Sequence, residues 1–336
     1  MPTIRRILVA VKELQQKPHP AALKAAQLAG ACGAELELFH SLAMPVYADL
    51  YALGHQGLVG LERELRQQAL RKLEAIAEQL RRRNINVTVA AEWDFPVYEA
   101  IIRRALRIKA NLIVVSRHEG RHTAPWLLRL TDWELVRLSP IPLLLVKSPH
   151  PYRRPAVLAA VDPTHAFEKP VQLDKQILRM ARTVSEALRG TLHAVHAYAR
   201  MPVGAVPLEA NTAGVMTPSL FRKMEQQARR VAKAAMTRAL GATRIAPSRL
   251  YLLPNDPIDA IAEAARKSRS AVVVMGAISR SGFKRLFIGN TAERVLDELS
   301  CDILVVKPLK FRNRVTGAAR GARVLTSSST GLMGYY

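Results

Sequence analysis

The chain has 336 residues, of which 50 are Lys or Arg and 27 are Asp or Glu, so its formal net charge is +23. This length predicts about two domains, and a content of 49% hydrophobic residues excludes a wholly disordered chain. No apolar stretch approaches the roughly 18 residues of a membrane-spanning helix, and the first apolar run is too short for a signal peptide. With its two cysteines far apart in the sequence, we expect a cytoplasmic protein without disulfides.

The first half of the chain alternates short apolar runs with segments of helical period. The runs predict strands at Ile7–Val11, Leu36–Phe39, Ile85–Val89, Leu112–Val115 and Leu143–Val146. The periodic segments predict helices at Ala21–Ala31, Leu61–Arg82, Val97–Ile108 and Thr131–Leu138.

The same series recurs in the second half. Strands are predicted at Val157–Val161, Leu192–Val195, Ser248–Leu252, Ala271–Met275 and Ile303–Val306. Helices are predicted at Leu173–Leu188, Leu220–Leu240, Ile258–Ser268 and Thr291–Leu299. Landmarks match between the halves: "LIVVS" ends at Ser116 and "VVVMG" at Gly276, while "PLLLVK" ends at Lys147 and "DILVVK" at Lys307.

A repeat of this length indicates two copies of one domain. Short apolar strands that alternate with helices are typical of an α/β fold with a parallel sheet buried on both faces. We therefore predict two tandem, doubly wound, five-stranded parallel sheets. The expected domains are residues 1–148 and 149–308, followed by a flexible basic tail at 309–336.

A ligand site is predicted where the strand order reverses, beyond the carboxyl ends of the strands. In the second copy this places Asp162 and the loop that starts at Gly276 at the site. Gly289, Asn290 and Thr291 open the following helix, and free backbone amides at a helix start bind phosphate. The alternative interpretation is that these three residues only cap the helix.

The sequence resembles the universal stress proteins, in particular their tandem two-domain members. The resemblance covers about residues 3–308 and rests on "ILVAV" near the start, "TDWELVR" at 131–137 and "FIGNTAERVLDELSCDILVVKP" at 287–308. It implies that the second domain binds ATP. By this resemblance Asp162 contacts adenine, Gly276, Gly289 and Asn290 cradle the phosphates, and Ser279 takes the place of the family's second loop glycine.

The first copy departs further from the nucleotide-binding pattern. Lys12 stands where that pattern has an acid, Ser116 replaces the first glycine, and Arg129 replaces the last. We therefore expect a degenerate, nucleotide-free first domain. His118 and His122 are spaced i, i+4 without an acidic or cysteine ligand, and we interpret them as solvated loop residues, with no metal site in the chain.

Three functional hypotheses remain open. The first is a non-catalytic stress-response protein that holds an adenine nucleotide in its second domain. The second is a scaffold for an apolar or amphipathic small ligand, bound by the segments 43–60 and 200–218, which we interpret as long loops. The third is weak nucleic-acid binding, although the excess charge is divided into +7, +11 and +5 over 1–150, 151–308 and 309–336. An enzyme is the least supported class, because no nucleophile with a base emerges.

The apolar closing strands also predict the assembly. Leu143–Val146 and Ile303–Val306 would otherwise be exposed edges that invite aggregation. We expect them to pair within one chain, which would give a pseudo-dimeric monomer. The alternative is that two such chains also associate as a homodimer.

Overall fold

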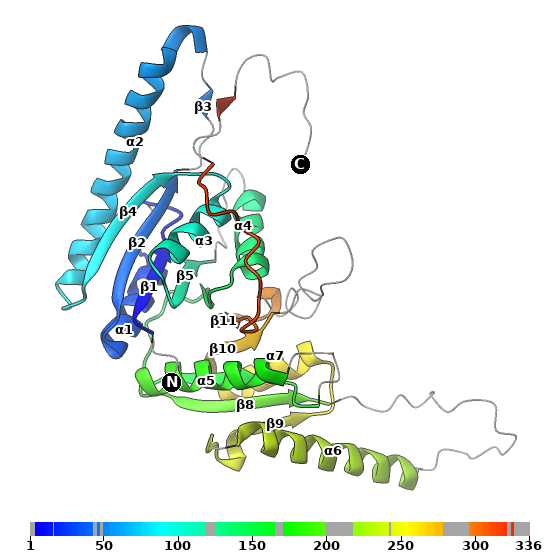
Figure 1. Cartoon of the computed structure of the whole chain (residues 1–336). Helices are drawn as coiled ribbons and strands as arrows, with labels where there is room; N and C mark the ends of the chain where they lie inside the picture. The colour runs from blue at the N-terminus through cyan, green and yellow to red at the C-terminus, as the bar shows by residue number, and fades with distance from the viewer. Residues whose placement is uncertain are drawn as a thin grey trace, which may run out of the picture. The chain divides into compact units, whose positions relative to one another are not determined.

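The computed structural model describes residues 4–15, 17–42, 46–47, 50–117, 125–164, 171–198, 218–241, 243–277, 296–320 and 324–325. The chain divides into two compact units. The first domain is formed by Thr3–Tyr152 together with the C-terminal residues from Phe311, and the second domain contains Arg153–Lys310. Figure 1 shows the elements of both domains.

The first domain contains a parallel sheet whose strands are ordered β4-β2-β1-β5-β6. These strands are β1 (Arg6–Ala10), β2 (Glu35–Leu42), β4 (Val87–Trp93), β5 (Leu112–Ser116) and β6 (Leu143–Val146). Strand β1 is central and pairs in parallel with β2 on one side and β5 on the other. Its residues Ile7 to Ala10 are almost wholly buried, as expected for a strand covered on both faces.

Four helices accompany this sheet: α1 (Pro20–Cys32), α2 (Leu50–Arg81), α3 (Val97–Arg107) and α4 (Pro125–Leu138). Helix α1 has Pro20 at its first turn and is capped after Cys32 by Gly33, whose φ of 65° lies in the left-handed region that favours glycine. Helix α2 packs along β2 and β4. Its buried side is a stripe of Ala69, Leu73, Ile76, Ala77 and Leu80.

The second domain repeats this architecture with the strand order β9-β8-β7-β10-β11. Its strands are β7 (Ala156–Ala160), β8 (Thr191–Ala197), β9 (Leu250–Leu253), β10 (Ser270–Gly276) and β11 (Asp302–Val306). Its helices are α5 (Val171–Ala187), α6 (Pro218–Leu240) and α7 (Pro257–Ser268), and a short 3-10 turn, η1 (Pro247–Arg249), precedes β9. The tandem α/β fold predicted from the sequence is thus confirmed.

One segment differs from the prediction. We expected residues 43–60 to form a long loop, but the two-residue strand β3 (Val46–Tyr47) lies within it and α2 begins at Leu50. Three glycines between 54 and 60 obscure the helical period there. The regular helix from 61 onward extends backwards through them because propagating a helix costs far less than nucleating one. The other expected loop, 200–218, lies outside the described residues except for Pro218, which opens α6.

The C-terminal segment also differs from the flexible tail that we expected. Residues 311–320 belong to the first domain, where the side chain of Val315 is buried. A two-residue strand, β12 (Val324–Leu325), pairs in parallel with β3. The difference arises because the segment binds a residue far from it in the sequence. Asp94, directly after β4, accepts a hydrogen bond from the backbone of Arg320.

Candidate functional site

Two neighbouring strands define the candidate site in the second domain. Strands β7 and β10 pair in parallel, with Ala160 opposite Met275. The chain proceeds from β7 outward to β8 and β9 and then returns to β10 on the other side of β7. The strand order therefore reverses between β7 and β10, and the carboxyl ends of these two strands bring Asp162 and Gly276 to the same sheet edge.

Asp162 is held in place by its neighbours. Its backbone N–H donates a 3.1 Å hydrogen bond to Oδ1 of Asp174, in the first turn of α5, and the hydroxyl of Thr164 donates one of 3.1 Å to Oδ1 of Asp162. Nδ1 of His196, on β8, lies 4.0 Å from the same oxygen. Asp162, Asp174 and His196 are each at most 5% exposed, so two carboxylates and an imidazole are packed together at the end of β7.

The second carboxylate oxygen of Asp162 is the chemically notable atom of this cluster. Oδ2 is buried and accepts no hydrogen bond from any residue that the structure describes. A buried acceptor without a donor carries a free-energy cost of about 1–3 kcal/mol. A ligand with an N–H or O–H group at this position would remove that cost.

Gly276 has a packing role at the same edge. A Cβ atom built on this residue would lie 2.5 Å from Cδ2 and 3.0 Å from Cγ of Leu173 on α5. Leu173 is fully buried, so a larger residue at 276 would push α5 away from the strand end. The glycine thus brings the start of α5 close to β10. Asp174, which orients Asp162, follows directly in that helix.

The remaining residues predicted for the phosphate loop are Ser279, Gly289, Asn290 and Thr291, and all four lie outside the described residues. Their part in the site therefore stays a prediction. Asp174 and His196 are site residues that the sequence analysis missed. The signal for Asp174 was an acidic residue on the apolar side of α5, between Leu173 and Ile177.

The first domain fills the equivalent position with its own side chains. Lys12 follows β1 as Asp162 follows β7, and Ser116 ends β5 as Gly276 ends β10. The ammonium group of Lys12 forms an ion pair with the carboxylate of Asp132 on α4 and donates a 3.3 Å hydrogen bond to the carbonyl oxygen of Ser116. Both side chains of the pair are less than 10% exposed. A cation on the protein thus occupies the place where a ligand's donor group would lie.

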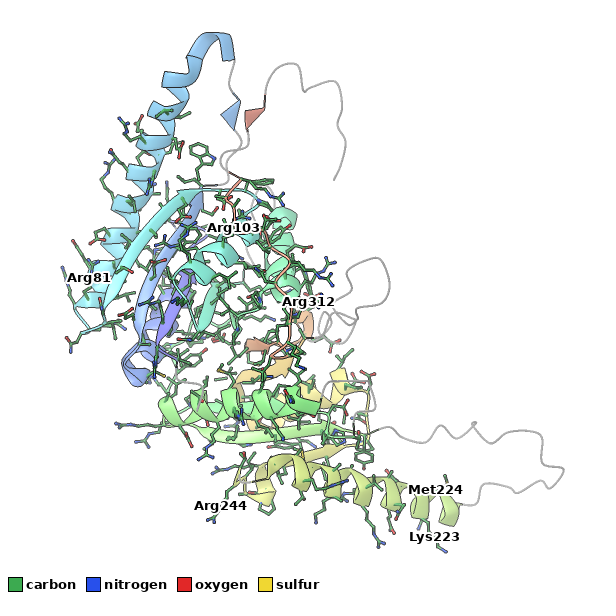
Figure 2. The ribbon with its side chains drawn as sticks, viewed as in Figure 1. Arg81, Arg103, Lys223, Met224, Arg244 and Arg312 are labelled. Atoms are coloured by element: carbon green, nitrogen blue, oxygen red, sulfur yellow. The ribbon has the colours of Figure 1, made fainter. Side chains whose placement is uncertain are left out.

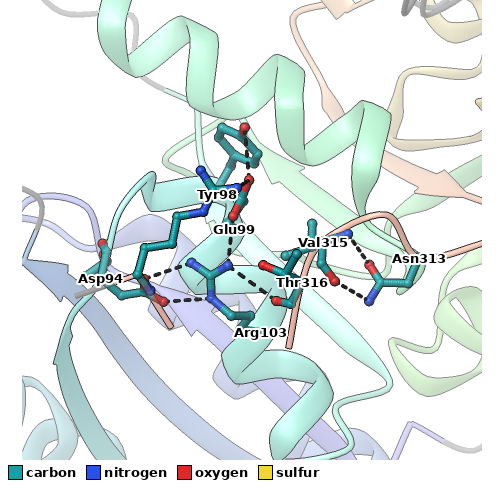
Figure 3. A network of polar contacts seen from close by, with 9 residues as sticks. Asp94, Tyr98, Glu99, Arg103, Asn313, Val315 and Thr316 are labelled. Carbon is teal, nitrogen blue, oxygen red and sulfur yellow. Dashed lines mark hydrogen bonds and ion pairs between the residues drawn. The ribbon is translucent and has the colours of Figure 1, made fainter. Parts of the chain in front are cut away.

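A second buried polar cluster lies where β4 meets α3 (Figure 3). The guanidinium of Arg103 donates two hydrogen bonds of 2.8 Å to the carboxylate of Asp94 and one of 2.8 Å to Glu99. Burial disfavours the charge of Arg103, but the hydrogen bonds that Arg103 donates to both carboxylates, together with their negative charges, outweigh that effect and raise its pKa above the ordinary value. The side chains of Arg103 and Asp94 are each 2% exposed.

The C-terminal segment completes this cluster. The carbonyl oxygen of Thr316 lies 3.4 Å from the Arg103 guanidinium, and the Arg320 guanidinium lies 3.1 Å from Glu99. The backbone N–H of Arg320 donates a 2.9 Å hydrogen bond to Asp94. Because two carboxylates face two guanidinium groups, the cluster is electrically balanced only when the segment is in place.

The described residues offer no metal site, no disulfide and no membrane-spanning helix. They contain no group of three or more His, Cys, Asp or Glu side chains that could hold a metal ion. Neither Cys32 nor Cys301 forms a disulfide. Among the helices that the structure describes, none combines the length and the apolar character needed to cross a membrane.

Comparison with known proteins decides the family. The model of the universal stress protein family matches residues 3–147 and again residues 157–307. The chain belongs to the universal stress protein family. The two matches coincide with the two copies of the fold, so this universal stress protein is a tandem member.

Similar relatives have the same tandem length. Universal stress protein E of Escherichia coli K12 is 25% identical over 317 residues, which cover 92% of this chain and 96% of the relative. A universal stress protein E homolog of Haemophilus influenzae is 27% identical over 224 residues, covering 65% of this chain and 69% of the relative.

Solved structures agree with the fold. A functionally unknown protein of Pseudomonas aeruginosa PAO1 superposes with a TM-score of 0.67 at 25% identity, covering 92% of this chain and 94% of the other. A universal stress protein from Archaeoglobus fulgidus gives a TM-score of 0.57 at 14% identity, covering 90% and 98%. The second of these supports the fold alone.

Proposed function

We propose that this universal stress protein is a cytoplasmic binding protein without turnover, and that its second domain holds an adenine nucleotide, ATP. The observation that carries the proposal is the buried Oδ2 atom of Asp162, which has no donor among the described residues and lies where the strand order reverses. The 6-amino group of adenine and the ribose hydroxyls are donors of the required kind. The predicted phosphate loop, with Gly289 and Asn290, follows β10 in the sequence.

The first domain is proposed to remain free of nucleotide. An adenine amino group requires an acceptor, whereas Lys12 presents a cation that is already bonded to Asp132 and to the Ser116 carbonyl oxygen. Opening this position for a ligand would leave the Asp132 carboxylate buried without its cation, which costs several kcal/mol.

Titration calorimetry with ATP tests the proposal. We expect one binding site per chain in the wild type and none in Asp162→Ala or Gly289→Val. The matched control is Glu186→Ala, which removes one carboxylate of the same domain. Glu186 is 49% exposed, near the far end of the α5 helix that begins next to the site. If wild-type protein shows no heat at millimolar ATP, or Asp162→Ala binds as the wild type does, the nucleotide proposal fails.

We also propose that the chain is a monomer, because one chain already carries two copies of the domain. Support comes from the tandem family match, which covers residues 3–147 and 157–307. Light scattering coupled to size-exclusion chromatography should give the single-chain mass of 37.2 kDa. A mass of twice that value would show that the copies also associate.

A further inference from the structure

The surface of α6 carries an unusual excess of positive charge. Between residues 218 and 240 the chain has six basic residues and a single acid, Glu225. The basic residues are all exposed: Arg222, Lys223, Arg229, Arg230, Lys233 and Arg238. No ion pair joins any of the six to a carboxylate in the part of the chain that the structure describes.

The equivalent helix of the first domain shows that this charge is not a general property of the fold. Helices α2 and α6 each follow the second long strand of their domain. Over Leu50–Arg81, α2 has five basic and four acidic residues, and Arg81 forms an ion pair with Glu74 on the same helix. The net charge is therefore +1 on α2 and +5 on α6, although both helices belong to the same basic chain.

The basic side chains form one outward surface. Helix α6 packs against α5 and β9, and it buries Ala232, Ala235, Met236 and Leu240 on that side. The opposite side carries the charges, together with exposed Gln226 and Gln227. From Lys223 to Arg238 the stripe is about 22 Å long at ~1.5 Å per residue. Figure 2 shows Lys223 near one end of α6 and Arg244, also exposed, just beyond the other.

The chemistry of this surface distinguishes between two anionic partners. A helix that binds a membrane surface inserts an apolar side into the lipid. The apolar side of α6 is already packed against its own domain. The outward surface offers charges and amides. Among the described residues of this surface, Val231 is the one large hydrophobic residue that is more than half exposed. Phosphates arranged along a nucleic-acid backbone match a linear array of Arg, Lys and Gln donors.

We propose that the outward surface of α6 is a docking surface for the phosphate backbone of nucleic acid, bound without sequence preference. The proposal does not depend on nucleotide binding at Asp162. By sequence, the net charge of +23 is divided over both copies and the C-terminal segment. The structure adds that +5 of this charge lies on the single helix α6. Engagement of six phosphates predicts that log K falls with log salt concentration with a slope of about −5, which amounts to roughly three decades between about 50 and 200 mM salt.

Fluorescence anisotropy with labelled DNA and RNA duplexes of about 20 base pairs, each in two unrelated sequences, tests this proposal at both salt concentrations. The test variant is Arg229→Glu/Arg230→Glu/Lys233→Glu, with Arg229→Gln/Arg230→Gln/Lys233→Gln as a milder form without added repulsion. The control Arg63→Glu/Arg66→Glu/Arg71→Glu changes the net charge by the same amount on exposed positions of α2. Far-UV circular dichroism of each variant checks that it folds.

We expect both α6 variants to lose at least about tenfold in affinity and to show a salt slope shallower by about 3. The α2 control should stay close to wild type, because charges beyond about 10 Å are largely screened at 0.1 M salt. Equal binding of DNA and RNA identifies the shared phosphate backbone as the ligand. The proposal is overturned if no duplex binds at the lower salt, or if the α2 control loses as much affinity as the α6 variants. Binding only to vesicles that contain phosphatidylglycerol would overturn it as well.

Discussion

The backbone N–H of Arg320 donates a 2.9 Å hydrogen bond to Oδ1 of Asp94, a buried carboxylate 226 residues earlier in the chain. Asp94 already accepts two hydrogen bonds from Arg103. The C-terminal segment is therefore attached to the buried carboxylate that also binds Arg103, in the core of the first domain. This makes the segment after the second domain a structural part of the first.

Deletion of residues 311–336 should destabilise the first domain. It removes the Arg320 N–H, exposes the surface covered by Val315 and leaves the Asp94–Glu99–Arg103 cluster with a net negative charge. We expect a loss of about 2–4 kcal/mol in the free energy of unfolding. Urea titration followed by tryptophan fluorescence reports on this domain alone, because all three tryptophans, Trp93, Trp126 and Trp133, lie within it.

Two control variants separate the contribution of residues 311–320 from that of the chain end and from that of the Arg320 side chain. Deletion of residues 327–336 keeps the cluster and should leave the transition unchanged. Arg320→Ala keeps the backbone N–H and removes a guanidinium that is 56% exposed, so its effect should stay below about 1 kcal/mol. If the protein that lacks residues 311–336 unfolds at the same urea concentration as the wild type, residues 311–320 add nothing to the stability of the first domain.

Arg103→Met should be among the most damaging substitutions in the chain. It removes the buried cation and leaves the Asp94 and Glu99 carboxylates facing each other at low exposure. Breaking a buried ion pair from one side costs about 3–5 kcal/mol. Arg107→Ala is the matched control, because Arg107 also pairs with a carboxylate, Glu92, but is 51% exposed. The same fluorescence titration should show a change of less than about 1 kcal/mol for that control.

The sequence predicted the strands and most helices to within a few residues, because each is marked by an uninterrupted apolar run or a clear helical stripe. It also located Asp162, since the position after a central strand is fixed by topology. It did not predict the partners of polar residues. Lys12 and Asp132 are 120 positions apart, and nothing local shows that the Lys at the end of β1 is neutralised by the Asp of "TDWELVR".

The C-terminal segment was missed for a related reason. Residues 309–336 contain five basic residues and no acidic one, which is typical of a solvated tail. Its attachment depends on backbone groups, such as the Thr316 carbonyl and the Arg320 N–H. Every residue type except proline offers both groups, so they leave no trace in the sequence.

Substitutions at the two equivalent strand ends should have opposite effects on stability. Lys12→Met removes the cation of a buried ion pair and should cost the first domain about 3 kcal/mol, measured by tryptophan fluorescence in urea. Asp162→Asn replaces a carboxylate whose Oδ2 has no donor among the described residues. A neutral amide is cheaper to bury, so the ligand-free second domain should become more stable by about 1 kcal/mol.

Thermal unfolding followed by circular dichroism, with and without ATP, checks the second half of this prediction. ATP should raise the unfolding temperature of the wild type and leave that of Asp162→Asn unchanged, while Glu186→Gln should behave as the wild type. An Asp162→Asn protein that is less stable than the wild type without ligand would mean that the carboxylate is satisfied within the protein.

The first domain should also lose stability under mildly acidic conditions because of His40. Burial lowers the pKa of His40, the hydrogen bond at 2.7 Å between its Nδ1 and the Val11 carbonyl oxygen opposes that shift, and the nearby Lys72 charge lowers the pKa further. The folded state therefore binds its proton at a lower pH than the unfolded state, whose imidazole titrates near 6.5. Well above pH 6.5 both states are neutral and the group has no effect.

As the pH falls below 6.5, the unfolded state takes up the proton first, and the stability of the folded state decreases by at most about 1.4 kcal/mol per pH unit. His40→Asn keeps an N–H donor for the Val11 carbonyl oxygen and does not titrate, so the decrease between pH 7 and 5.5 should become shallower by this contribution. Urea titrations of both proteins at closely spaced pH values, read by tryptophan fluorescence, measure the difference. Parallel pH profiles would show that His40 takes up its proton equally readily in the folded and the unfolded first domain.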